Sequence, residues 1–272
     1  MPKKYLVLNN HSNLLVNKWT IEFVRNLCKE NKNLKVLFEG IPSGVSFLKQ
    51  SEDVFGFYSK LCNSLRYDKL TRKQEKFVKE YFDIEQLENM PFTLMLIGIS
   101  EFADNTGIDI IDSLLEEEPK VDSIEDFVEG YIYSNPTKKR DDFMREEVEK
   151  YNGDCVVIIG GNHIIHWLES DLLESKSDYF VVVPTVDKKI IPLKEVINCF
   201  NKAYGKKIKY DSKLDKEVNE KTDKKLGEAS KNGFNIDYYL GLNEFKYDME
   251  CFSENDDIKE ILGGLEINQS DG

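Results

Sequence analysis

Histidine is the residue type whose placement in this chain most directly suggests chemistry. The protein has three histidines, and two of them, His163 and His166, lie in the segment CVVIIGGNHIIHW at residues 155–167. An apolar run that ends in a glycine-rich turn is typical of a buried strand that delivers a polar group to the edge of a sheet. Ligands of open α/β sheets bind at that edge, so His163 is a candidate for acid–base catalysis or metal ligation.

Two further polar side chains follow apolar runs in the same way. The run at 5–8 is followed by His11, and the run at 36–38 by Glu39. If these strands are parallel to and adjacent to the strand before His163, the three side chains project from one edge of the sheet. Two imidazoles and a carboxylate can hold a divalent first-row metal ion. They can equally form a metal-free set in which Glu39 orients or deprotonates a histidine.

Arg140 opens the segment RDDFM, which precedes the strand that ends at His163. We expect a helix over 140–151, which places Arg140 at a helix N-terminus, where the dipole disfavours a cation. An arginine there needs a carboxylate or an anionic ligand to compensate its charge; the alternative is an ordinary surface arginine. His166, one helical turn after His163, is either a second site residue or part of an amphipathic helix.

The elements that must position these groups alternate between strands and helices. Five short apolar runs are continuous in pattern, which is typical of strands covered on both faces. These runs lie at 5–8, 36–38, 92–99, 156–159 and 179–183. Helical patterns lie at 13–30, 108–116, 123–133 and 140–151. The alternation predicts an α/β fold with a central, mostly parallel sheet flanked by helices.

We expect one α/β domain at 1–204, with a helical insertion at about 45–90 because that segment is long for a single crossover. Residues 205–272 are expected to form a C-terminal extension that is partly flexible. Within it, 206–232 mixes nine lysines with six acidic residues, which indicates a solvated helix or a linker. The aromatic block at 234–245 is expected to dock back onto the domain.

The composition disfavours several classes of function. A net charge of −13 disfavours binding to nucleic acid, and the eleven acidic residues at 101–130 are most simply a solvated face. Five scattered cysteines without a CxxC pair indicate free thiols rather than a zinc site. The motifs GxGxxG, GxxxxGK[ST], GxSxG and HExxH are absent. No apolar run approaches the roughly 18 residues of a membrane span, so we expect a cytoplasmic protein.

In their order along the chain, these motifs resemble the superfamily that groups TIKI proteases, TraB/PrgY proteins, ChaN-like haem-binding lipoproteins and erythromycin esterases. The resemblance spans residues 4–184, and its matches are His11, Glu39-Gly40, Arg140-Asp141-x-x-Met144 and Gly160-x-x-His163. The first motif departs from the family pattern, because it lacks the usual glycine and acidic residue; Asn10 would replace the latter. Relatives often have an aspartate after the third strand, and Glu101 or Asp104 would take over that role.

The resemblance implies a mixed α/β fold with a site formed by Glu39, Arg140, His11 and His163. Our leading hypothesis is a hydrolase of a small-molecule or peptide substrate, with or without a divalent metal ion held by His11, Glu39 and His163. Glu39 would activate a water, the histidines would bind the metal or shuttle protons, and Arg140 would hold an anionic group or an oxyanion. The alternatives are a haem- or iron-binding protein and a non-catalytic binding or effector module on the same fold.

Overall fold

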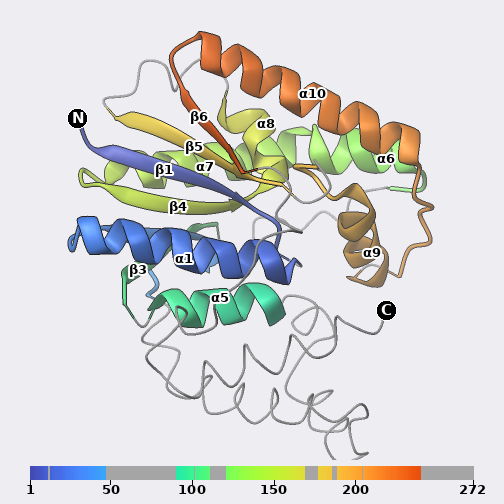
Figure 1. Cartoon of the computed structure of the whole chain (residues 1–272). Coiled ribbons are helices and arrows are strands. Elements are labelled where there is room, and N and C mark those ends of the chain that lie inside the picture. The colour runs from blue at the N-terminus through green and yellow to red at the C-terminus, as the bar shows by residue number, and fades with distance from the viewer. Residues whose placement is uncertain are drawn as a thin grey trace, which may run out of the picture.

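Six parallel strands form the centre of the chain (Figure 1). The computed structural model describes residues 1–11, 13–46, 90–100, 102–110, 121–168, 177–185, 189–203 and 205–239. In this part the strand order is β3-β2-β4-β1-β5-β6, and every strand pair is parallel. The predicted α/β fold with a central parallel sheet and flanking helices is confirmed. The strands are β1 (Lys3–Asn9), β2 (Lys35–Pro42), β3 (Asp104–Asp109), β4 (Cys155–Gly160), β5 (Asp178–Pro184) and β6 (Asn235–Tyr239).

Helices cover both faces of the sheet (Figure 1). α1 and α5 pack together on one face, whereas the other helices share one apolar core with the opposite face. Among the described helices, none combines the length and the apolar character that a membrane crossing requires. The helices are α1 (Leu14–Glu30), α5 (Met90–Ser100), α6 (Ile124–Phe127), α7 (Asn135–Lys150), α8 (Ile164–Trp167), α9 (Leu193–Ala203) and α10 (Ser212–Lys231).

The strands are continuously apolar because both of their faces are buried. Successive side chains of a strand point to opposite faces of the sheet. Leu6 and Val157 accordingly belong to the core shared with α7 and α10, while their neighbours Val7 and Val156 are buried toward the other face. Each such side chain stabilises the fold by roughly 1.5–3 kcal/mol. The sheet is therefore held from both sides, which fixes the positions of the strand ends.

The apolar run at 92–99 is a helix, so our prediction of a strand there was wrong. The run forms α5, whose Phe92, Met95 and Ile99 are buried. A helix that is apolar all round has no amphipathic period, so its sequence pattern cannot be distinguished from that of a buried strand. The position of α5 against α1 places Phe92 beside the candidate site.

The third strand along the chain is β3, in a segment where we expected no strand. Its sequence, DNTGID, contains only one large aliphatic residue. We predicted a helix at 108–116, which overlaps the end of this strand. In the structure Ile108 and Asp109 belong to the strand, and 111–120 lies outside the described residues. A side chain at Gly107 would lie 2.1 Å from the Ile41 carbonyl oxygen. β3 is thus specified by close backbone pairing with β2, which hydrophobic patterning does not reveal.

α7 begins at Asn135, five residues before the start that we expected. Pro136 lies in its first turn, where a missing N–H has no cost. Arg140 therefore lies in the second turn, and the expected conflict with the helix dipole does not arise. The helix expected at 123–133 is present as α6 followed by a π-helical turn at Val128–Ile132.

Residues 205–239 complete the sheet. α10 buries one side, including Val218 and Leu226, and exposes most of its lysines, so the segment is a docked helix and not a linker. β6 then pairs with β5 as the sixth strand. The part of the expected insertion from 47 to 89, and the extension beyond 239, lie outside the described residues.

The neighbouring strands β1 and β4 send the chain to opposite faces of the sheet. After β1 the chain enters α1, and after β4 it enters α8, which belongs to the core of the other face. A parallel sheet opens at such a point, outside the carboxyl ends of its strands, and ligands of open α/β sheets bind there. Asn9 and Gly160, the last residues of β1 and β4, are paired in register at this point.

We predict that Asn219→Ala lowers the free energy of unfolding by about 2–3 kcal/mol, because it leaves buried backbone groups without partners. The Asn219 amide oxygen accepts from the N–H groups of Ile190 and Ile191 at 3.0 and 2.9 Å, and its nitrogen donates to the Ile191 carbonyl at 3.0 Å. Urea denaturation of the two proteins measures the difference. The matched control is Lys216→Ala on the same helix, which removes only an exposed ion pair and should change stability by less than about 1 kcal/mol. Equal losses in both variants would show that α10 is not anchored through Asn219.

Candidate active site

Glu39 is the centre of a buried polar cluster at the carboxyl ends of β1, β2 and β4. Its Oε1 atom lies 2.7 Å from His163 Nε2 and 3.0 Å from Arg140 Nη2. Its Oε2 atom lies 3.3 Å from His11 Nε2 and accepts the N–H of Gly160. The structure therefore brings together all four side chains that the sequence singled out as site residues.

The charge of Glu39 is held by its cationic neighbours. Burial alone would raise the pKa of this carboxyl, because desolvation penalises the charged form. The charges of His163, Arg140 and His11 outweigh burial and hold the pKa of Glu39 well below its usual range. Glu39 is thus a fixed anion whose two oxygens face four nitrogen groups.

A bulge in β2 turns Glu39 into the cluster. The register between β2 and β3 shifts between Phe38 and Pro42, and bulges of this kind re-aim a side chain at the end of a strand. Gly40 has a φ of 77°, a conformation that favours glycine. Its N–H donates to Asp109 Oδ2 at 2.8 Å. The backbone conformation of residue 40 therefore explains why a glycine follows Glu39 in the sequence.

His163 is buried between two carboxylates. It lies in the 3-10 turn Gly161–His163 that follows β4, and it is only 2% exposed. Its Nε2 faces Glu39, and its Nδ1 is hydrogen-bonded to Asp141. Burial would lower the pKa of His163, but the Glu39 and Asp141 charges outweigh burial and raise it to about 10. Burial also raises the pKa of Asp141, against the opposing effect of His163.

Arg140 is compensated by two carboxylates, although it does not lie at the helix N-terminus where we expected it. Its Nε lies 2.9 Å from Asp109 Oδ1, its Nη2 is paired with Asp109 Oδ2, and Nη2 also contacts Glu39. Burial would lower the pKa of Arg140, but Glu39 and Asp109 outweigh it and raise the pKa. The Arg140 side chain remains 24% exposed, so one part of it is open to solvent.

His11 is the most exposed imidazole of the cluster, with 28% of its side chain accessible. It lies in the turn between β1 and α1, and its Nδ1 is 3.1 Å from Asn9 Oδ1. The ring of Phe92 lies beside it, with 4.0 Å between the ring centroids. A Cβ atom at Gly160 would lie 3.4 Å from both His11 Nε2 and Glu39 Oε2, at the near limit of ordinary van der Waals contact, so Gly160 packs closely against the cluster.

The expected metal ligands His11, Glu39 and His163 are arranged as hydrogen-bonding partners of one another. The Nε2 atoms of both histidines point at the Glu39 oxygens, and the Arg140 guanidinium contacts the same carboxylate. In the part of the chain that the structure describes, no group of three or more His, Cys, Asp or Glu side chains is placed to hold a metal ion. A divalent cation would have to displace the Arg140 charge, so the residues as placed do not fit one.

The remaining candidates from the sequence lie beside the cluster or away from it. His166 is buried in α8 and interacts electrostatically with Asp141, so it lies at the back of the cluster. Asp104 begins β3 at the opposite edge of the sheet, where it is exposed and paired with Lys35 at 3.4 Å. Glu101 lies outside the described residues. Asp104 therefore cannot supply the carboxylate expected after the third strand.

Sequence reasoning missed three buried polar residues that support the site. Asp109 ends β3 and supplies a carboxylate to Arg140, whereas we had expected Glu101 or Asp104 to be the acidic residue after the third strand. Asp141 belongs to the motif Arg140-Asp141-x-x-Met144, where we gave it no role, but it is 1% exposed and bonded to a site histidine. The third is Asn9, which is hydrogen-bonded to His11. Its position two residues before His11 in the sequence could have indicated this contact.

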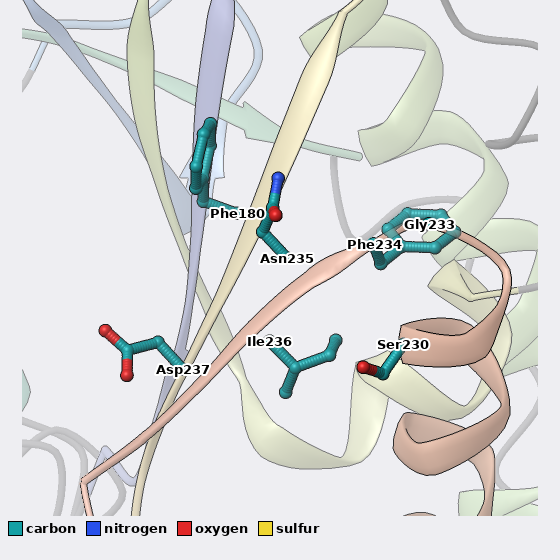
Figure 2. Close-up of a pocket in the computed structure, with 7 residues that line it drawn as sticks. All are labelled: Phe180, Ser230, Gly233, Phe234, Asn235, Ile236 and Asp237. Atoms are coloured by element: carbon teal, nitrogen blue, oxygen red, sulfur yellow. The ribbon is translucent and has the colours of Figure 1, made fainter.

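A separate hollow of about 530 Å³ lies at the β5–β6 side of the sheet (Figure 2). None of the residues around Glu39 lines it. Because its polar groups are few and belong to α10, β6 and the turn between them, we do not assign the chemistry to this hollow. Its lining residues are Phe180, Ser230, Gly233, Phe234, Asn235, Ile236 and Asp237.

Comparisons with protein-family models, with curated proteins and with solved structures find no match to this chain. The resemblance to the TIKI, TraB/PrgY and ChaN-like proteins therefore stays a prediction.

We predict that the stability of the protein falls as the pH rises from about 6.5, the ordinary histidine value, through about 10, the folded value for His163. A raised folded-state pKa contributes stability that is fully present below the unfolded value and is lost as pH rises through the folded one. Urea denaturation at several pH values measures this loss. The His163→Gln variant should have a lower free energy of unfolding, which should change less over the same pH interval. Other titrating groups are common to both proteins, so parallel curves would contradict the prediction.

Proposed function

We propose that this protein is a metal-independent hydrolase of small esters or amides, in which His11 is the general base and Arg140 binds the developing anion. One observation carries the proposal. His11 and Arg140 are the cluster residues with substantial exposure, 28% and 24% of their side chains, and both contact the buried carboxylate of Glu39. A molecule that enters from solvent would meet a base and a cation held at a fixed separation.

Glu39 is better suited to orient the base than to act as one. Its oxygens already face His163, Arg140, His11 and the Gly160 N–H, and its pKa is lowered. A carboxylate in this state has little capacity to take a proton from water. The geometry thus supports the metal-free alternative, in which Glu39 orients a histidine, over the hypothesis that Glu39 itself activates a water.

The charges of the cluster can compensate a proton that His11 takes from a substrate water during the reaction. Glu39, Asp109 and the Asp141–His163 pair sum to two negative charges, whichever member of that pair holds the proton, and Arg140 contributes one positive charge. A neutral His11 leaves one negative charge in excess. A proton taken up by His11, whose Nε2 lies 3.3 Å from Glu39 Oε2, balances this excess inside a largely buried site.

The reaction would then proceed by attack of a water on the substrate carbonyl. His11 takes a proton from the water as the water oxygen bonds to the carbonyl carbon, and the carbonyl oxygen becomes an oxyanion. Arg140 stabilises that oxyanion. When the bond to the leaving group breaks, its electrons stay with the leaving group, which takes the proton from His11. Every proton and electron pair is thus accounted for without a cofactor.

Haem or iron binding has less support from the geometry. Both ring nitrogens of His163 are occupied by carboxylates, so ligation of iron by His163 would require breaking both contacts. A binding or effector module on the same fold would keep the cluster as a structural element. These alternatives are distinguished from the hydrolase by experiment.

The test is hydrolysis of p-nitrophenyl acetate and p-nitrophenyl butyrate by the full chain in the presence of EDTA. We predict turnover by the wild type and a fall in kcat/KM of roughly 100- to 10,000-fold in His11→Ala, the range typical of a lost general base. Lys216→Ala, on the exposed side of α10, is the control, and circular dichroism confirms the fold of each protein. Arg140→Lys should lower kcat, because lysine keeps the charge without the forked donor geometry.

Other outcomes would replace the proposal. Turnover that appears only when Zn²⁺ or Mn²⁺ is added would support the metal-dependent alternative. A Soret shift on haem titration that His163→Ala abolishes would support haem binding. Equal rates in the wild type and His11→Ala would remove His11 from the chemistry, and absence of turnover on both esters would favour a non-catalytic module.

A further inference from the structure

The guanidinium of Arg140 has three nitrogens, and two of them face buried carboxylates. Nε donates to Asp109 Oδ1 at 2.9 Å, and Nη2 donates to Asp109 Oδ2. Nη2 also lies 3.0 Å from Glu39 Oε1. Asp109 thus holds one edge of the guanidinium by two parallel hydrogen bonds, which is the strong and geometrically specific form of an arginine–carboxylate pair.

The third nitrogen, Nη1, is the open part of the Arg140 side chain. Within the described residues, Nη1 makes no hydrogen bond and is nevertheless not a buried atom. The side chain as a whole is 24% exposed, whereas the two carboxylates that its other nitrogens face are each 6% exposed. Nη1 is therefore the nitrogen that a molecule entering from solvent can reach.

Asp109 is fixed independently of Arg140. Its Oδ2 accepts the N–H of Gly40 at 2.8 Å, and its Oδ1 accepts the N–H of Ile110 at 2.8 Å. One of these backbone donors belongs to the bulge of β2, and the other to the residue that follows β3. Because both donors are tied to the sheet, the fold sets the direction in which Asp109 presents its oxygens to the guanidinium.

We propose that Asp109 is a positioning residue that orients Arg140 so that only Nη1 meets the substrate, and that the site therefore selects neutral esters or amides over anionic ones. An arginine binds a carboxylate or phosphate best through two nitrogens of its fork, and here Nε and Nη2 are already used. Nη1 alone can still donate to one oxygen, as the oxyanion of an attacked carbonyl requires. The role of Nη1 in the reaction rests on the proposed function, whereas its orientation by Asp109 does not.

The charges around Arg140 favour the same selectivity. The buried ion pairs of the cluster leave one negative charge in excess while His11 is neutral. A substrate with a negative charge of its own would add to this excess in a site where like charges repel more strongly than in water. A neutral substrate becomes negative only in the transition state, when His11 has taken a proton. Discrimination against anionic substrates thus has both a geometric and an electrostatic cause.

The orientation is tested by a ¹H–¹⁵N spectrum of the arginine side chains in the ¹⁵N-labelled full chain, with Arg140→Lys to assign the signals. We predict separate signals for the two Nη groups of Arg140, because the contacts with Asp109 stop rotation about the Nε–Cζ bond. The Nη1 protons should exchange with water faster than those of Nη2. Asp109→Asn should merge the two Nη signals, whereas the control Asp104→Asn, at the exposed start of the same strand, should leave them separate.

The wild-type spectrum alone can overturn the proposal. A single averaged Nη signal, or Nη1 protons that are protected as well as those of Nη2, would show that Asp109 does not orient the guanidinium. This result needs no variant at position 109, so it remains decisive if Asp109→Asn fails to fold. Separate signals that persist in a folded Asp109→Asn protein would also contradict the proposal, because another group would then hold Arg140.

Activity tests the selectivity separately, with two esters whose acyl chains have the same length. We predict that kcat/KM for p-nitrophenyl butyrate exceeds that for the mono-p-nitrophenyl ester of succinic acid by about tenfold or more. Asp109→Asn should lower kcat for the butyrate ester by roughly 100-fold with little change in KM, the loss typical of a misplaced catalytic group. It should also narrow the preference between the two esters, because the fork of Arg140 becomes available to the succinate carboxylate.

Equal kcat/KM values for the two esters in the wild type would contradict the selectivity, and an unchanged kcat in Asp109→Asn would contradict the positioning role. If the wild type hydrolyses neither ester, the proposed function fails, while the spectrum still decides whether Asp109 orients Arg140.

Discussion

A buried carboxylate is the constraint on which the rest of the site depends. Removing a charge from water costs several kcal/mol unless partners compensate it. Glu39 therefore requires donors, and the fold supplies them from segments far apart in the chain: the turn after β1, the end of β4 and the second turn of α7. The same requirement ties these elements together, because moving any one of them would expose an unpaired charge.

The charges alternate outward from this centre. His163 and Arg140 flank Glu39, and each is backed in turn by a second carboxylate, Asp141 or Asp109. Because the charges alternate, each buried charge is stabilised by neighbours of the opposite sign. These interactions offset the cost of removing the ionised groups from water. The consequence for chemistry is that the inner members are held by their partners, so only the exposed ends can contact a substrate.

The convergence of the site could be predicted from the sequence because it follows from topology. The carboxyl ends of parallel strands meet at one edge, so the polar residues after three apolar runs had to approach one another. β4 lies between β1 and β2, so the N–H of Gly160 at the end of β4 reaches the glutamate of β2.

The parts that escaped prediction lack a periodic signal. α5 is apolar all round and resembles a buried strand, whereas β3 is polar and pairs through its backbone. Misplacing the third strand also concealed Asp109, since the residue at the end of a strand can be recognised only when the strand is. Asp141 escaped for a different reason: an aspartate in a polar helix gives no sign that its partner is a buried histidine.

The first motif of the chain gains a physical meaning from this arrangement. It lacks the acidic residue of the pattern that it resembles, and we expected Asn10 to replace that residue; in the structure Asn9 contacts the histidine. An amide offers a directional acceptor without a charge. A carboxylate in its place would add a second negative charge beside His11, whereas Asn9 leaves Glu39 as the anion that compensates a proton on the ring. In this site position 9 therefore supplies a neutral acceptor to the ring, and position 39 supplies the compensating charge.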